Sequence, residues 1–248
     1  MIGVFDSGVG GLTVIKPLLE YFKSDIVYLG DTARVPYGNK SKETIIKYSI
    51  ENTKFLLKKG VDFIIVACNT ASSLAIEALR NTFNVPIFGV VESTAKIASN
   101  FSNVAVIGTK ATIESNAYEK TIKMFNKNAS IEQRACPLFV PLIEEGLIDD
   151  EITKIVAKRY LNGIDAQALV LGCTHYPLIK HVIQDILPNT TIIDSGTSII
   201  HTIDKSMLNG SGKVEFYATD SPESFSKIGK FFLGKDFNGV KLVNLEEL

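Results

Sequence analysis

Residues 63–79 read FIIVACNTASSLAIEAL, and residues 168–183 read ALVLGCTHYPLIKHVI. In both stretches a continuously apolar run leads through a cysteine and a threonine into an amphipathic segment. Such runs are typical of parallel strands covered on both faces, and a strand followed by a helix is the repeating unit of α/β folds. A looser match joins 3–20 to 104–120. These repeats predict an α/β protein, and they leave open whether it has two similar halves or merely two units alike by chance.

The same alternation extends over most of the chain. Strands are expected at the apolar runs 2–5, 26–29, 63–67, 87–91, 104–107, 168–171, 191–193 and 214–217. Helices are expected at 11–22, 42–58, 71–82, 93–101, 112–126, 150–161, 177–187, 196–207 and 222–232. This order predicts doubly wound, parallel-rich sheets, which bind ligands beyond the carboxyl ends of their strands.

Length and composition exclude several classes of protein. The 248 residues suit one large domain or two modest ones. A net charge of -1 argues against a dedicated nucleic-acid binder or a polybasic membrane sensor. Three cysteines do not make a disulfide scaffold and indicate a reducing compartment. Because neither a signal peptide nor an apolar run of membrane-spanning length is evident, the expected location is the cytoplasm.

Cys68 and Cys173 are the strongest candidates for chemistry. Each ends an apolar run and precedes a predicted helix, whose N–H groups and positive dipole end favour a thiolate. The alternative is that both are small, buried apolar residues, as free cysteines often are. Cys136 is expected to be structural, and His181 and His201 are expected to lie on the surface.

Other kinds of site fit the sequence less well. Cys173 and His175 are two positions apart, but the sequence has no CxxC or HxxxH motif, so a metal site is not expected. A nucleophilic Cys–His pair stays open. The segment 6–13 and Asp31 lie where a dinucleotide-binding motif would, yet Thr13 replaces its third glycine. An NAD(P)-dependent oxidoreductase and a non-catalytic ligand-binding protein therefore remain alternatives.

Polar residues gather where the predicted strands end. They supply hydrogen-bond donors for carboxylates and acceptors for an ammonium group, which suits a zwitterionic amino acid. The residues are Asp6, Ser7, Asn69, Thr70, Thr109, Thr112 and Thr174. The segment 34–38, RVPYG, predicts a rigid loop that carries an aromatic ring.

Five motifs together resemble the glutamate racemase family. They are DSGVGGLTV at 6–14, DTARVPYG at 31–38, VACNTAS at 66–72, FVPLIEEG at 139–146 and LGCTHYPL at 171–178. The two cysteine motifs are shared more widely in the aspartate/glutamate racemase superfamily, whereas DSGVGG and PYG narrow the resemblance to glutamate. FYATDSPESF at 216–225 departs from the family pattern because no glycine follows its threonine.

The resemblance implies a cofactor-independent isomerase that interconverts L- and D-glutamate for peptidoglycan synthesis, and hence for cell-wall biogenesis and cell shape. It implies that Cys68 and Cys173 are catalytic bases on opposite faces of the substrate. Asp6 is implied as the auxiliary acid near Cys68, His175 as the helper of Cys173, and Glu144 as a further acid. The implied substrate-binding residues are Asp6, Ser7, Tyr37, Gly38, Asn69, Thr70, Thr112, Thr174 and His175.

The resemblance also implies the architecture and the partners. Two similar α/β domains would enclose the active site in a cleft, with domain A formed by 1–92 and 208–248 and domain B by 93–207. The expected partners are glutamate and a second copy of the chain, with no metal, cofactor, nucleic acid or membrane. Aspartate racemase, or a related amino-acid racemase, is the alternative within the superfamily. Because no pyridoxal lysine motif is evident, proton transfer, electrostatics and exclusion of water must stabilise the carbanion. Closure of the two domains is the hypothesis for how water is excluded.

Overall fold

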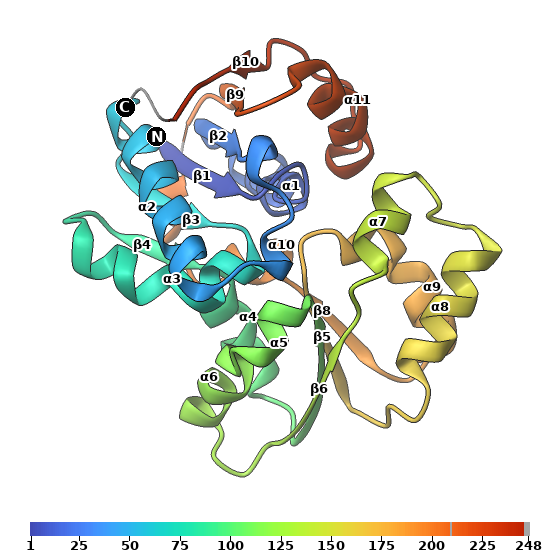
Figure 1. The fold of residues 1–248 in the computed structure, drawn as a ribbon. Helices are drawn as coiled ribbons and strands as arrows, with labels where there is room; N and C mark the ends of the chain where they lie inside the picture. Colours follow the sequence, from blue (N-terminus) through green and yellow to red (C-terminus); the bar gives the residue numbers. More distant parts are fainter. Residues whose placement is uncertain (209, 246–248) are drawn as a thin grey trace.

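The computed structural model of the protein describes residues 1–208 and 210–245. It has two parallel β-sheets, one of six strands and one of four, with helices packed around them (Figure 1). The predicted α/β class with parallel sheets is therefore confirmed. Within the described residues, every helix is too short or too polar to cross a membrane.

The six-stranded sheet combines both ends of the chain. Its order is β10-β9-β2-β1-β3-β4, so β9 pairs with β2 although most of the chain separates them (Figure 1). The central strands β1, β2 and β3 are buried at every residue, which explains their continuously apolar sequences. The strands are β1 (Ile2–Asp6), β2 (Ile26–Gly30), β3 (Phe63–Val66), β4 (Ile87–Gly89), β9 (Val214–Ala218) and β10 (Lys241–Leu242).

The four-stranded sheet repeats the order of the first four strands. Its order β6-β5-β7-β8 matches β2-β1-β3-β4 strand for strand. Cys68 follows β3 and Cys173 follows β7, so the two thiols occupy equivalent places. This common order supports two similar halves over chance similarity. The strands are β5 (Asn103–Gly108), β6 (Ser130–Ala135), β7 (Ala168–Gly172) and β8 (Thr191–Asp194).

The helices largely follow the predicted segments, and local sequence sets several of their ends. Ser41 caps the second helix by accepting a hydrogen bond from the Thr44 N–H at 3.3 Å, and Gly234 ends the last helix with φ of 76°. The helices are α1 (Leu12–Phe22), α2 (Lys42–Lys58), α3 (Asn69–Thr82), α4 (Val90–Ala98), α5 (Lys110–Glu114), α6 (Ala117–Phe125), α7 (Phe139–Glu144), α8 (Glu151–Leu161), α9 (Lys180–Ile186), α10 (Ser195–Ile199) and α11 (Pro222–Leu233). Short 3₁₀ helices lie at Thr32–Arg34, Tyr37–Asn39, Tyr176–Ile179 and Lys205–Leu208.

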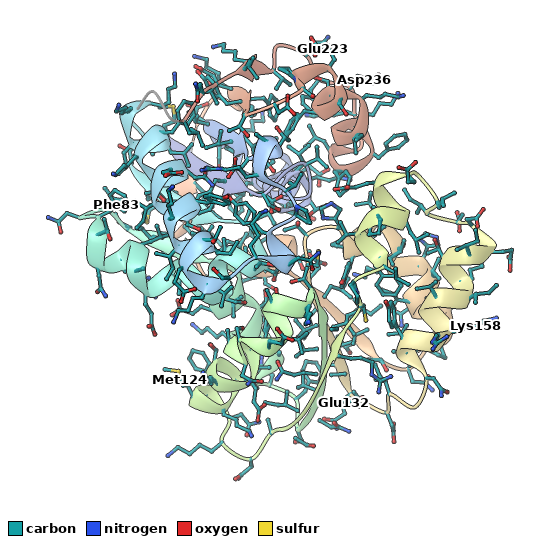
Figure 2. All side chains as sticks on the ribbon, in the orientation of Figure 1. Phe83, Met124, Glu132, Lys158, Glu223 and Asp236 are labelled. Atoms are coloured by element: carbon teal, nitrogen blue, oxygen red, sulfur yellow. The ribbon has the colours of Figure 1, made fainter. Side chains whose placement is uncertain are left out.

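Some predicted elements differ from the observed ones. The single helix expected over 112–126 is two helices, because Asn116 adopts a left-handed conformation with φ of 54°. The helix expected over 196–207 ends at Ile199. Strands β6 and β10 and helix α7 were not expected. β6 is a half-exposed edge strand of mixed polarity, and its Glu132 lies at the rim of the molecule (Figure 2).

Helices α1, α4 and α10 join the two sheets. Thr13 in α1 donates a hydrogen bond to the backbone oxygen of Thr174 at 2.9 Å, and Ser93 in α4 bonds Thr202 at 2.7 Å. The domain boundaries at 92–93 and 207–208 stay a prediction. Residues 209 and 246–248 of the predicted segment 208–248 lie outside the described residues.

Candidate active site

A cavity of about 320 Å³ lies beyond the carboxyl ends of β1, β3, β5 and β7. Its volume is near the lower end of the range for ligand pockets, so it suits a small molecule. A larger groove of about 760 Å³ over α3, α5 and α6 has no cysteine or histidine in its wall. The smaller cavity is lined by Ser7, Gly8, Val35, Pro36, Tyr37, Gly38, Asn39, Cys68, Asn69, Thr70, Thr109, Lys110, Pro137, Val140, Pro141, Glu144, Cys173, Thr174 and His175.

Two free thiols face this cavity from different sheets. Cys68 is 5% exposed and its Sγ lies 3.9 Å from the Oγ of Ser7. Cys173 is 6% exposed and its Sγ lies 3.9 Å from the Nδ1 of His175. A single small ligand can therefore meet a thiol from each half of the protein.

The surroundings of Cys68 favour the protonated thiol. Burial raises its pKa to about 12, and the negative charge of Asp6 acts in the same direction. Hydrogen bonding with the Ala71 N–H and with the Ser7 hydroxyl opposes this shift without overcoming it. The start of α3 was expected to favour a thiolate at Cys68, but the desolvation of the buried thiol outweighs the effect of the helix terminus.

A cationic group lies beside Cys173. His175 Nε2 is 2.8 Å from the Oε1 of Glu144, while its Nδ1 faces the thiol. Burial alone would lower the pKa of His175, but the hydrogen bonds and charges of Cys173 and Glu144 raise it to about 10. The imidazole is thus protonated at neutral pH. The two thiols therefore lie in unequal environments, since the carboxyl group of Asp6 acts on Cys68 and a cationic imidazole lies beside Cys173.

Asp6 lies behind the cavity wall and connects the two sides of the site. It is fully buried, and it accepts hydrogen bonds from the Gly8 N–H at 3.0 Å and from Thr174 Oγ1 at 3.4 Å. Burial raises the pKa of Asp6, although the positive charge of His175 lowers it in part. The carboxyl group therefore holds the loop after β1 against the loop after β7.

The glycine-rich loop after β1 allows this close approach. A Cβ at Gly10 would lie 2.2 Å from Thr174 Oγ1 and 2.6 Å from His175 Nδ1. Packing against the second half therefore accounts for glycine at this position without a dinucleotide. Asp31, which lies where a dinucleotide-binding motif would place an acid, instead accepts hydrogen bonds from Arg34 Nε at 2.7 and 2.9 Å.

A cluster of hydroxyl and amide groups forms the polar wall. The hydroxyl groups of Thr70, Thr109 and Thr112 lie 2.9–3.2 Å from one another and so link α3 to the start of α5. Thr70 and Thr109 face the cavity, whereas Thr112 is fully buried behind them. Asn69 also lines the cavity, and its Nδ2 is a buried donor with no partner.

The segment 35–39 closes another side of the cavity. Tyr37 is 1% exposed, and its hydroxyl donates to the carboxylate of Asp31 and accepts from Asn52 Nδ2 at 3.1 Å. A Cβ at Gly38 would lie 2.9 Å from the Cβ of Thr109, so this segment packs directly against the second half. The RVPYG loop is thus anchored at its aromatic ring.

Most of the predicted site residues line the cavity, with Asp6 and Thr112 immediately behind its wall. Sequence reasoning missed the apolar wall formed by Pro137, Val140 and Pro141, although the FVPLIEEG motif that contains Glu144 could have indicated it. Across residues 1–208 and 210–245, no three His, Cys, Asp or Glu side chains are grouped so that they could hold a metal ion.

An α/β fold with two thiols in one cavity is the arrangement of an amino-acid racemase that works through side-chain bases. Residues 19–203 match the family described as Asp/Glu/Hydantoin racemase, and the chain belongs to this family. Many of the relatives that it matches are named glutamate racemase. That of Persephonella marina is 49% identical over 97% of this chain and 96% of its own length.

Solved structures agree with this assignment. The glutamate racemase of Francisella tularensis in complex with D-glutamate is 39% identical, with a TM-score of 0.92, and the match covers 100% of this chain and 98% of that one. The glutamate racemase of Thermus thermophilus in complex with beta-chloro-D-alanine is 42% identical, with a TM-score of 0.90 and the same coverage. The predicted resemblance to glutamate racemases is confirmed.

Proposed function

We propose that this protein interconverts L- and D-glutamate by direct transfer of the α-proton between Cys68 and Cys173. The proposal depends mainly on one observation. The two cysteines follow equivalent strands of the two sheets, and both line one small cavity. Relatives named glutamate racemase match nearly the full length of the chain, which supports glutamate as the substrate.

The unequal surroundings of the two thiols indicate which cysteine holds the proton at each stage of the reaction. The thiolate of one cysteine takes the α-proton from one face of the substrate, and the thiol of the other gives its proton to the opposite face. The carbon is thereby inverted, and thiol and thiolate have exchanged places. With the pKa of Cys68 raised to about 12 and protonated His175 beside Cys173, we assign the resting proton to Cys68.

The remaining predicted residues support this transfer. Asp6 acts beside Cys68, His175 acts beside Cys173, and Glu144 holds His175 through its 2.8 Å contact. We propose that Ser7, Tyr37, Gly38, Asn69, Thr70, Thr174 and His175 bind the carboxylates and the ammonium group of the substrate. Asp6 and Thr112 support this binding from behind the cavity wall. Closure of domain B, residues 93–207, on domain A, residues 1–92 and 208–248, would exclude water and strengthen these interactions.

The test is racemisation of L-glutamate and L-aspartate side by side, followed by circular dichroism in a metal chelator and without added cofactor. Loss of signal with glutamate alone supports the proposal. Equal loss with aspartate would favour an aspartate racemase. A reaction that requires NAD(P), with a change in its absorbance, would favour an oxidoreductase.

We further propose that the product supplies peptidoglycan synthesis in the cytoplasm and that the active form is a homodimer. The family membership supports all three statements. Depletion of the protein in its own host should then cause lysis that external D-glutamate prevents. Sedimentation velocity should give twice the mass of 27.1 kDa.

A further inference from the structure

We propose that Tyr118 and Ser195 are positioning residues that fix the side-chain amide of Asn69 with its nitrogen turned toward the ligand. The proposal rests on the proposed function, because it takes the ligand to be an amino acid with carboxylates. Tyr118 lies in α6 and Ser195 begins α10, whereas Asn69 begins α3.

The oxygen of the Asn69 amide is already occupied. Its Oδ1 accepts a hydrogen bond from the Tyr118 hydroxyl at 2.5 Å and another from Ser195 Oγ at 3.3 Å. A separation of 2.5 Å suits an O–H···O bond and is shorter than the range of about 2.7–3.2 Å for N–H···O. The atom facing Tyr118 is therefore the amide oxygen and not the nitrogen.

The nitrogen of the same amide has no partner. Asn69 is 2% exposed and lines the cavity, and its Nδ2 is buried without a hydrogen bond. Buried donors in native proteins are normally paired, so an unpaired one at a cavity wall indicates a ligand atom that accepts from it. A carboxylate only accepts hydrogen bonds, and it matches Nδ2. A flipped amide would instead set its oxygen against the carboxylate.

The two hydroxyl groups suit this role because both are buried and stay protonated. Tyr118 is fully buried, and burial raises its pKa well above the ordinary value, so it is a donor throughout the working pH range. Both hydroxyls come from the half of the chain that carries the four-stranded sheet, while Asn69 follows a strand of the other sheet. The amide orientation is thus imposed across the junction between the two halves.

Substitutions that remove only the hydroxyl groups test this role. Tyr118→Phe and Ser195→Ala should each raise the KM for glutamate about 2- to 10-fold, while kcat stays within about twofold, because a carboxylate contact binds ground and transition states alike. In an Asn69→Ala background the same substitutions should leave KM unchanged. Tyr217→Phe is a matched control, since Tyr217 is also buried but its hydroxyl contacts Glu215 at 2.9 Å.

The outcomes separate this proposal from the proposed function. An unchanged KM in both single variants, or an equal rise in the Asn69→Ala background, would overturn the positioning role. A fall in kcat with KM unchanged would overturn it as well. If Tyr118→Phe does not fold, Ser195→Ala decides alone. Calorimetry measures the Kd for glutamate, so the same comparison of single and Asn69→Ala double variants can be made without measuring racemisation. A wild-type protein that binds glutamate but does not racemise it would therefore contradict only the proposed function.

Discussion

Replacing Gly10 by alanine should disable the site while leaving the fold intact. The added Cβ would lie 2.2 Å from Thr174 Oγ1 and 2.6 Å from His175 Nδ1, whereas ordinary Cβ contacts lie at 3.4–4 Å. The two loops must therefore separate by roughly 1 Å. This shift displaces the Nδ1 of His175, which lies 3.9 Å from the Cys173 Sγ.

The expected loss of activity follows from that displacement. A misplacement of about 1 Å in an active site costs about 10²-fold in rate, which corresponds to about 2.7 kcal/mol of transition-state stabilisation. The overpacking itself should lower the free energy of unfolding by about 1–3 kcal/mol. Circular dichroism at saturating and limiting L- and D-glutamate measures the first effect, and urea denaturation measures the second. Because the equilibrium constant of racemisation is one, kcat/KM must fall equally in both directions.

Gly60→Ala is the matched control. Gly60 follows α2 with φ of 75° and would place its Cβ in open space. Alanine there costs about 1–2 kcal/mol of conformational strain but moves no group of the site, so activity should persist. A Gly10→Ala variant with kcat/KM within threefold of wild type would refute the close-packing explanation. An equal loss of activity in both variants would show that the loss comes from lower stability of the whole protein and not from the contact at Gly10.

Three further predictions concern the charges and thiols. Cys68→Ser and Cys173→Ser should each lower kcat by about 10²–10⁴-fold, while exchange of the α-proton with deuterium persists for one enantiomer; racemisation at the wild-type rate by either variant contradicts the two-base assignment. The raised pKa of His175 means that its stabilising charge is complete below the ordinary value of 6.5 and is lost as pH rises through about 10. The difference in unfolding free energy between wild type and His175→Ala should therefore shrink from pH 6.5 to 10, and a constant difference would count against it. Asp31→Asn removes the buried charge that Arg34 contacts and should lower the unfolding free energy by about 1.5–3 kcal/mol in urea denaturation, whereas a loss below 0.5 would show that the pair contributes little.

The fold was predictable where burial is uniform. Strands β1, β2, β3 and β7 are buried at every residue, so their sequences are continuously apolar. β6 was not predictable because it pairs with β5 alone and alternates exposed polar residues with half-buried ones. The break at Asn116 depends on one residue in a left-handed conformation, which hydrophobic periodicity does not register.

The residue pattern predicted the candidate site at its strand ends, and the family resemblance added Tyr37, Gly38 and Glu144. Cys68 and Cys173 stand out because each comes within two residues of the end of an apolar strand. Tyr118 and Ser195 carry no local signal, since their contact with Asn69 joins elements far apart in the sequence. The protonation of Cys68 was also misjudged, because desolvation depends on the packing around the thiol and not on its neighbours in sequence.

The pairing of β9 with β2 has a consequence for synthesis on the ribosome. β1 to β4 emerge first, yet the exposed side of β2 has no partner until β9 has been made, after all four strands of the other sheet. An unpaired parallel strand edge can bind other chains, and translation proceeds at about 5–20 residues per second. The edge of β2 in the nascent N-terminal part therefore stays unpaired for several seconds. Truncation before Val214 should leave a product that aggregates.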